Sequence, residues 1–393
     1  MTRTEIKQGY RLMRFEELYE SWFEGNLTQC QAAEVLGVSE RTFRRHVERY
    51  KDEGIEGVID GRLARRGETR IPPEVVEFVT ELYQEKYFDY NTRHFFQVLR
   101  RDHNFSHSYN WLRGVLQLRG ITKPLPRRGV YRRKRARKAM VGMMLHQDGS
   151  THAWLPGRMD DLIVTLDDAT NEIYSIFLVE EEGTISSLKG IRDVVDKKGI
   201  FCSLYVDRGS HYVHTPSAGG KVSKHEHTQV QRACRQLGIE MIFAYSPQAR
   251  GRSERMFRTL QGRLPQELRA HDITSIEQAN AYIRERFLPA FNAEFMIPPA
   301  HPTSAFCPYI GHDLDVVLSL QEHRVVKNDN TLSFNNKVLQ LPSDEFRHHY
   351  VRSKVTVCQH LEGHISVLYG PRIIAIFEKD GSLRDQPSLQ EVA

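Results

Sequence analysis

Three carboxylates stand in sequence contexts that suit metal-assisted chemistry on phosphate esters. Asp148 lies in HQDGSTHAWL and Asp207 in YVDRGSHY, each after an apolar, strand-like run, and Glu254 lies in a helical segment, SPQARGRSERMFRTLQGRL. Hard oxygen ligands without a His/Cys cluster nearby suit Mg²⁺ or Mn²⁺ rather than zinc. Two such ions can hold the attacking and leaving oxygens of an in-line phosphoryl transfer. We therefore predict that the three residues form one catalytic metal site.

The three acids together, rather than any one of them, carry this prediction. A single Asp at the end of a strand is more often a cap or a turn residue. Here small residues accompany the acids and let a DNA backbone approach closely; they are Gly149, Gly209 and Gly251.

Other polar residues of this region are left outside the predicted site. Asp167 and Asp168 follow an apolar strand and are predicted to be structural turn residues, although a supporting role for Asp167 stays open. Because no paired cysteines indicate zinc, four histidines stay unassigned: His211, His214, His225 and His227.

The segments around the acids predict a mixed sheet flanked by helices. Apolar runs predict strands over 140–147, which ends at Asp148, and over 162–166, 173–179, 201–206 and 241–245. Helices are predicted over 184–197, from the capping box at Thr228, around Glu254, and from a capping box at Thr274 and Glu277 to about residue 291. Neighbouring strands of such a sheet can place Asp148 beside Asp207, and a helix across that edge can bring in Glu254.

The N-terminal segment predicts a helix-turn-helix that binds DNA. A helix over 11–25 precedes a short helix capped by Thr28, a turn at Gly37 and a second helix capped by Ser39. The second helix of this motif enters the major groove, so the residues predicted to contact DNA are Arg41, Thr42, Arg44, Arg45 and Arg49. The alternative is a solvated basic helix in an ordinary helical bundle.

Further helices and a basic segment separate this motif from the acids. Helices from Pro73, from Thr92 and from Tyr109 predict a second helix-turn-helix-like unit, for which a plain helical core is the alternative. Eight of the twelve residues from 127 to 138 are Lys or Arg, a density that phosphates would neutralise. We predict DNA contacts there, against a solvated linker, from Arg127, Arg128, Arg132, Arg133, Lys134 and Arg135.

The charge and composition agree with a nucleic-acid-binding N-terminal part on a globular body. Residues 1–140 hold 28 Lys and Arg against 19 Asp and Glu, whereas the remainder holds 27 against 31. Five scattered cysteines predict free thiols rather than disulfides or a zinc ribbon. With no signal-peptide core and no apolar run of roughly 20 residues, we expect a cytoplasmic protein that does not enter a membrane.

The C-terminal segment has short apolar strands separated by turn sequences. Strands are predicted over 331–334, 337–341, 353–358, 364–369 and 373–377. They predict a small all-β barrel over residues 324–393. The full set of predicted domains is a helix-turn-helix domain at 1–60, a second helical domain at 61–122, a basic linker at 123–139, the catalytic core at 140–297, a connector at 298–323 and the barrel.

This order of parts resembles the DDE superfamily of transposases and retroviral-type integrases. The separations of Asp148, Asp207 and Glu254 fit that superfamily, as do YVDRGSHY and SPQARGRSERMFRTLQ, and bacterial transposases of the ISNCY type are the nearest resemblance. The resemblance covers nearly the whole chain and implies a multidomain protein with N-terminal all-α helix-turn-helix modules, an RNase H-like α/β core and a C-terminal β-barrel. The His-His-Cys-Cys module of retroviral integrases is missing, because only Cys30 precedes residue 200.

The resemblance also implies an activity. Asp148 would bridge two Mg²⁺ or Mn²⁺ ions, with Asp207 and Glu254 each completing one side. The enzyme would cut at the terminal inverted repeats of an insertion sequence and join the freed 3′-OH to target DNA. A homo-oligomer, at least a dimer on DNA, would hold two ends together in the bacterial nucleoid.

Helical spacing adds two residues to the site and leaves two rival functions open. Arg258 and Gln261 share the helical face of Glu254, so we predict that they contact DNA; a surface pair of Arg258 with Glu254 is the alternative. A DNA-binding regulator with an inactive core is one rival, which the intact triad argues against. An RNase H-like nuclease without strand transfer is the other, and it would need less DNA-holding equipment than this chain has.

Overall fold

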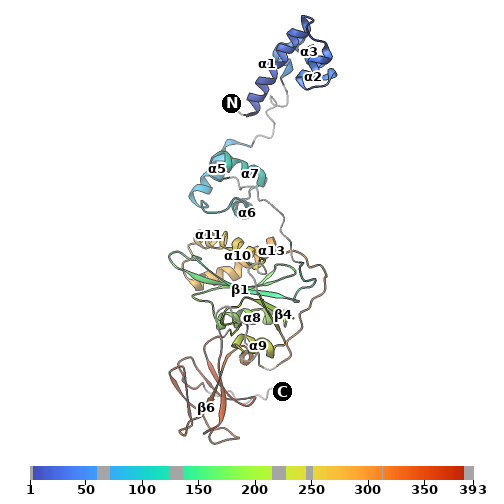
Figure 1. Ribbon diagram of the computed structural model, residues 1–393. Coiled ribbons are helices and arrows are strands. Elements are labelled where there is room, and N and C mark those ends of the chain that lie inside the picture. Colours follow the sequence, from blue (N-terminus) through green and yellow to red (C-terminus); the bar gives the residue numbers. More distant parts are fainter. Residues whose placement is uncertain are drawn as a thin grey trace. The chain divides into compact units, whose positions relative to one another are not determined.

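The computed structural model describes residues 3–59, 71–123, 136–214, 227–244, 251–311 and 313–384 (Figure 1). The chain divides into two compact units, residues 1–79 and 80–393. Six residues of the predicted basic contact lie outside the described ranges: Arg127, Arg128, Arg132, Arg133, Lys134 and Arg135. The loop histidine His225 lies outside them too. All five cysteines are free, as predicted. No described helix is both long and apolar enough to cross a membrane.

The N-terminal unit contains the predicted helix-turn-helix. Its elements are α1 (Arg3–Phe23), α2 (Gln29–Leu36), α3 (Glu40–Glu53) and the short 3-10 helix η1 (Gly54–Val58). Thr28 and Gln31 form a full capping box at α2, Gly37 ends it with a φ of 74°, and the Ser39 hydroxyl caps α3. The predicted core is confirmed, because Ala32, Ala33, Phe43 and Val47 are buried against α1, with Leu36 and Val38 packed around them.

The second helical region consists of α5 (Pro73–Glu85), α6 (Thr92–Asp102) and α7 (Tyr109–Leu118). Side chains cap the last two helices, Asn91 for α6 and Ser108 for α7. Each of these helices presents one apolar face, and the buried residues are Phe95, Leu99, Leu112 and Leu116. The three predicted helices are therefore present.

A five-stranded mixed sheet forms the centre of the second unit. Its strands are β1 (Leu145–His152), β2 (Asp160–Asp167), β3 (Ile173–Val179), β4 (Ser203–Val206) and β5 (Glu240–Phe243), in the order β3-β2-β1-β4-β5. The first three strands are antiparallel neighbours, whereas β4 runs parallel to both β1 and β5. The predicted mixed sheet is thus confirmed, with β1 at its centre.

The first strand of the core differs from its prediction at both ends. It was predicted over 140–147, before Asp148, but β1 begins at Leu145 and continues to His152, so Asp148 lies inside it. The polar residues after Asp148 still pair with β2, from Gly149 opposite Ile163 to His152 opposite Asp160. Backbone pairing extended the strand although its side chains lose their apolar pattern.

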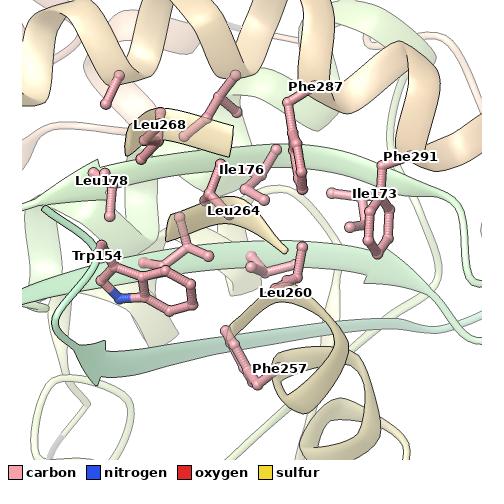
Figure 2. Packing of buried hydrophobic residues seen from close by; sticks show 14 of the residues in the cluster. Trp154, Ile173, Ile176, Leu178, Phe257, Leu260, Leu264, Leu268, Phe287 and Phe291 are labelled. Carbon is pink, nitrogen blue, oxygen red and sulfur yellow. The ribbon is translucent and has the colours of Figure 1, made fainter. Parts of the chain in front are cut away.

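Helices cover both faces of the sheet (Figure 1). On one face lie α8 (Thr184–Lys198) and α9 (Gln229–Gln236), and on the other α10 (Ser253–Gln261), α11 (Leu264–Ala270) and a long segment made of α12 (Ile276–Tyr282), the π-helical η3 (Ile283–Phe287) and α13 (Leu288–Phe295). Figure 2 shows Phe257 and Leu260 of α10 among the side chains of the hydrophobic core between these helices and the sheet. Both side chains are buried, at 6% and 0% exposed.

Two details of this helical layer correct the sequence analysis. The long helix is capped by Ser275, whose hydroxyl accepts from the Gln278 N–H, and not by Thr274. The helix α11 was not predicted, because Gly262 and Pro265 around its start are signals that usually end a helix. Its buried residues Leu264 and Leu268 join the core of α10.

The C-terminal region consists of antiparallel strands after the short helix α14 (Leu314–Val317). They are β6 (Leu320–Val325), β7 (Thr331–Phe334), β8 (Lys337–Gln340), β9 (Lys354–Gln359), β10 (Ile365–Tyr369) and β11 (Arg372–Phe377). A four-stranded sheet has the order β11-β10-β9-β6, and β7 pairs with β8 alone. The strand β6 lies partly in the segment predicted as connector, because its polar residues gave no strand pattern. Closure of these sheets into a barrel stays a prediction, as do the domain boundaries.

Buried polar contacts join α6 to the helical layer of the core. His94 Nε2 lies 2.8 Å from Glu267 Oε1, and the Tyr282 hydroxyl donates to Glu267 Oε2 at 2.5 Å. Burial alone would raise the pKa of Glu267, but the hydrogen bonds from His94 and Tyr282 and the charge of Arg101 lower it to about 2. Burial is the main cause that lowers the pKa of His94.

These shifts predict that acid weakens the second unit. The lowered pKa of Glu267 contributes stability above its unfolded pKa of 4.5, and this is lost as the pH falls toward 2; about 3 kcal/mol is at stake. Below pH 6.5 the unfolded state also binds a proton at His94 more readily than the folded state does. Melting temperatures measured from pH 7 to pH 3 should fall steeply in the wild type and less steeply in Glu267→Gln. The exposed control Glu285→Gln should follow the wild type, and an equal slope in Glu267→Gln would remove this explanation.

Candidate active site

Asp148 is placed by the alternation of side chains along β1. In an antiparallel pair, residues opposite each other share a face, and Asp148 lies opposite Val164, which belongs to the core covered by α10. His146 and Ser150, two residues to either side, therefore share that face. Asp148 is 8% exposed. A carboxylate thus stands in the centre of the sheet, on the α10 side.

Asp207 follows the last residue of the neighbouring strand. The parallel register pairs Leu145 with Leu204 and His146 with Tyr205. Continued by two residues, that register sets Asp207 opposite Asp148. The Gly209 N–H donates to Asp207 Oδ1 at 2.8 Å, which fixes the direction of the half-buried carboxylate. The two acids are therefore neighbours across the β1–β4 pair.

Glu254 lies in the first turn of α10, and this helix is attached to β1 at both of its ends. At its start, Arg252 pairs with the buried carboxylate of Asp168, which in turn lies 2.7 Å from His146 Nε2. At its end, Gln261 Nε2 donates to Ser150 Oγ at 3.1 Å. Both attachments end on the face of β1 that holds Asp148.

The lengths of helix and strand between these attachments agree. The nine residue-to-residue steps of helix from Arg252 to Gln261 rise by about 13.5 Å, and the four steps of strand from His146 to Ser150 rise by about 13 Å. The helix α10 therefore runs along β1. We measure position along the common direction of α10 and β1, starting from the level of Arg252 and His146. Glu254 then lies at about 3 Å and Arg258 at about 9 Å, and Asp148 lies between them, at about 7 Å.

The acids are not already gathered around one point. Within the described ranges, no three His, Cys, Asp or Glu side chains are arranged so that they could hold a metal ion. Glu254 is exposed, whereas Asp148 is buried. The structure thus sets Asp148 beside Asp207, and α10 carries Glu254 alongside the same part of β1. The complete triad stays a prediction.

Asp168 holds the start of α10. Burial would raise the pKa of this carboxyl, but hydrogen bonds from His146 and the Lys138 N–H and the charge of Arg252 outweigh burial and hold its pKa well below the usual range. Asp167 accepts backbone N–H bonds from Gly142, Ala169 and Thr170. The contacts of Asp167 are those of the predicted turn residue, whereas Asp168 also connects the strand of Asp148 to the helix of Glu254, which its sequence context did not indicate.

Two of the predicted glycines stand where a side chain would collide with charged groups. A Cβ on Gly149 would lie 2.2 Å from a carboxylate oxygen of Glu182, and a Cβ on Gly209 would lie 3.0 Å from Asp207 Oδ1. Glu182 also lies 3.4 Å from His211 Nε2. Sequence reasoning left out Glu182, because it stands in a run of three glutamates, 180–182, that looks like solvated surface.

The predicted DNA contacts divide by exposure. Arg258 is exposed on the Glu254 face of α10, whereas Gln261 is engaged with Ser150. On α3 the exposed residues are Arg41, Arg44, Arg45 and Arg49. Thr42 is half-buried and its hydroxyl lies 2.7 Å from that of Ser39, so it belongs to the cap of the helix. These DNA contacts remain untested predictions.

Comparison with known proteins finds a family match to the N-terminal region and relatives of nearly the whole chain. Residues 24–77 match a family described as winged helix-turn helix. The protein y4bF of Sinorhizobium fredii, which is assigned as a transposase, is 28% identical over 383 residues, covering 95% of this chain and 83% of its own length. The transposase for insertion sequence IS1202 of Streptococcus pneumoniae is 24% identical over 378 residues, covering 87% and 81%.

Solved structures with low similarity scores include viral integrases. A chain of the simian T-cell lymphotropic virus intasome, in complex with PP2A regulatory subunit B56 gamma, has a TM-score of 0.33 at 12% identity, covering 64% of this chain and 85% of that one. The HTLV-2 integrase catalytic core domain in complex with magnesium has a TM-score of 0.29 at 13% identity, covering 37% and 88%. Scores at this level do not by themselves establish a shared fold.

The similarity to transposases extends over all parts of the molecule. The helix-turn-helix, the mixed sheet with its acids and the C-terminal strands all lie within the alignment, which omits only a twentieth of the chain for the Sinorhizobium protein. The family match lies over α2 and α3, where the exposed arginines are. This similarity to bacterial transposases, one of them the transposase of an insertion sequence, covers nearly the whole chain, and it identifies the function as that of a DNA transposase.

Proposed function

We propose that Asp148, Asp207 and Glu254 are the catalytic residues of this transposase and together hold two Mg²⁺ ions, with Mn²⁺ as a substitute. Asp148 would be a ligand of both ions, and Asp207 and Glu254 would each be a ligand of one. The observation that carries the proposal is the attachment of α10 along β1 by His146, Asp168 and Arg252 at one end and Ser150 and Gln261 at the other. This attachment places Glu254 of α10 alongside the part of β1 that contains Asp148.

The donor set suits a hard divalent cation. Asp148 and Asp207 are adjacent in register, and both charges raise the pKa of the buried Tyr212 nearby, after burial itself and the charge of Glu182. Two carboxylates so placed repel each other, and a cation between them removes that repulsion. Oxygen ligands of this kind fit Mg²⁺ or Mn²⁺. Such ions supply Lewis-acid activation of the attacking and leaving oxygens of the phosphate ester.

The residues of the chain then position the substrate. Water attacks the phosphodiester at the end of the element, which leaves a 3′-OH on the element and a 5′-phosphate on the flanking DNA. That 3′-OH then attacks a phosphodiester of the target DNA with the same in-line geometry, and the 3′-oxygen of the cut target strand leaves. Arg258 stands one turn from Glu254 and binds a phosphate beside the scissile bond, and Gln261 supports the floor of the site through Ser150. Gly149 and Gly209 lie beside the acids and let Glu182 and His211 approach the backbone there, because a Cβ at either position would collide with these side chains or with Asp207.

The same proposal assigns the remaining parts to DNA. The exposed arginines of α3 bind the terminal inverted repeats, and residues 127–135 bind the adjoining phosphates. The C-terminal strands form the closed barrel. A homo-oligomer, at least a dimer on DNA, holds two ends of the element at once, because joining requires both ends at one target.

The direct test is a strand-transfer reaction. The full chain is incubated with Mg²⁺, labelled duplexes that carry the inverted repeats flanking the gene, and a supercoiled target plasmid. We expect labelled ends to become joined to the plasmid, and joining should require the repeat sequence. Cleavage of duplexes without any joined product would favour the nuclease alternative, and repeat binding without cleavage would favour the regulator.

The α3 arginines give a separate prediction about binding. Arg44→Ala and Arg45→Ala should each weaken binding of the full chain to the repeats about tenfold and lower the slope of log affinity against log salt concentration, since each removes a phosphate or base contact. The ion pair of Arg44 with Glu40, at 3.6 Å between exposed groups, is too weak to explain such an effect. Fluorescence anisotropy between about 50 and 200 mM salt measures both quantities.

The matched control for these variants is Arg14→Ala, an exposed arginine on α1 of the same unit. It should bind like the wild type. If Arg14→Ala weakens binding as much as the two α3 variants do, the α3 surface is not the recognition face, and general charge accounts for the binding.

A further inference from the structure

A buried hydrogen bond links the loop after Asp207 to the strand of Asp148. The Tyr212 hydroxyl donates to Gln147 Oε1 at 3.1 Å. Tyr212 lies five residues after Asp207 in the chain, and Gln147 is the residue immediately before Asp148. The bond therefore joins the chain neighbours of two carboxylates that the proposed function assigns to one metal site.

The Gln147 amide is held from three directions. Its Nε2 donates to Thr165 Oγ1 at 3.1 Å and to the Ser187 carbonyl at 3.0 Å, while its Oε1 accepts from Tyr212. A Cβ on Gly190 would lie 2.3 Å from Gln147 Nε2, so α8 has room for the amide only because residue 190 has no side chain. An amide fixed in this way cannot rotate without breaking buried hydrogen bonds.

The loop is fixed as firmly at its other contacts. The N–H groups of Tyr212 and Val213 both donate to the Gly209 carbonyl at 3.0 Å, and Thr228 Oγ1 donates to the Tyr212 carbonyl at 3.2 Å. Tyr212 is 1% exposed. The Gly209 N–H binds Asp207 Oδ1 in the same tight turn. A displacement of the Tyr212 ring would therefore move Asp207.

Gln147 and Asp148 point to opposite faces of the sheet, because side chains alternate along a strand. The contacts of Gln147 lie on the α8 side, whereas Asp148 faces α10. Tyr212 thus acts from behind the sheet and does not touch the reacting atoms. From there Tyr212 can fix the distance between Asp207 and Asp148 without occupying the face of the sheet on which DNA would bind.

We propose that Tyr212 and Gln147 are positioning residues that fix the separation of Asp207 from Asp148 and so set the affinity of the site for its divalent cations. The inference rests on the proposed function, since it takes both acids as metal ligands. Partners that orient metal ligands in this way typically change metal affinity tenfold to a hundredfold when they are removed.

The test measures metal binding by the full chain, with Mn²⁺ as the probe in titration calorimetry. Tyr212→Phe should weaken Mn²⁺ binding at least tenfold and raise the Mg²⁺ concentration needed for half-maximal joining, while saturating Mg²⁺ restores most of the rate. Gly190→Ala should have the same effect by a different route, because its methyl group would displace the Gln147 amide. The effect of Tyr212→Phe combined with Gly190→Ala should be far less than additive, since both act on one hydrogen bond.

The control is Tyr174→Phe, which removes the hydroxyl of another buried tyrosine of the same hydrophobic cluster. It should lower the melting temperature about as much as Tyr212→Phe does, yet bind Mn²⁺ like the wild type. Wild-type Mn²⁺ affinity in Tyr212→Phe and Gly190→Ala, with binding lost in Asp148→Asn, would overturn the positioning role and leave the proposed function standing. Wild-type Mn²⁺ binding in Asp148→Asn would overturn both.

Discussion

Replacing Asp148 or Asp207 with asparagine, or Glu254 with glutamine, should lower cleavage and joining of element ends by about a thousandfold or more. Each change keeps the size of the side chain and removes one negative charge from the proposed metal site. Because the reaction depends on stabilising charge at the attacking and leaving oxygens, the loss of one ligand should remove most of the catalysis. The measurement is the single-turnover rate of cleavage of a pre-bound end.

The variants should still bind the ends, because the predicted DNA contacts of α3 lie outside the core. Double variants should be no slower than single ones, since the three acids act as one unit. The control is Glu180→Gln, a carboxylate on the same unit that is 85% exposed and pairs only distantly with Arg158. It should cleave at the wild-type rate. An active Glu254→Gln enzyme would mean that the third ligand is another residue, with Glu182 beside Gly149 as the first candidate.

Replacing Arg252 with alanine should lower the cleavage rate about a hundredfold, although Arg252 is not itself assigned to the chemistry. Arg252 pairs with Asp168, which is fully buried and is held from the strand side by His146. Without the guanidinium, the start of α10 loses its attachment to β1, two residues from Glu254. A misplacement of about 1 Å at a reacting group can cost about a hundredfold in rate.

The appropriate control is Arg255→Ala on the same helix, where the exposed guanidinium bonds only to the Gly251 carbonyl among the contacts described. It should leave the rate unchanged. The rates are compared well below the melting temperature of each variant, because Arg252→Ala leaves a buried carboxylate with one partner fewer and lowers stability. A wild-type rate in Arg252→Ala would show that the Asp168 attachment does not position Glu254.

Elements with local signals in the sequence could be predicted to within a residue. The cap residue Thr28 indicated the start of α2, and short apolar runs bounded by turn residues gave β3 and β7 their exact bounds. The capping box of Thr228 with Gln231 located α9 in the same way. In each case the side chains that end the element lie within a few residues of it in sequence.

Features that depend on distant partners could not be predicted. The strand β1 continues past Asp148 because β2 pairs with it. In the same way, β6 forms on a polar segment because β9 pairs with it. The contact of Asp168 with Arg252 joins residues 84 positions apart, and nothing local to either residue indicates it. The sequence contexts predict the three acids as the site, whereas they give no indication of the residues that hold these acids in place.

A crystal structure of the full chain with Mn²⁺ and a cleaved element end tests the central claim most directly. Anomalous scattering locates the ions independently of the protein model. The account predicts two peaks about 4 Å apart, with Asp148 touching both and Asp207 and Glu254 each touching one, while Arg252 remains paired with Asp168. Peaks bound elsewhere in the core, or a Glu254 carboxylate directed away from Asp148 with DNA in place, would contradict it.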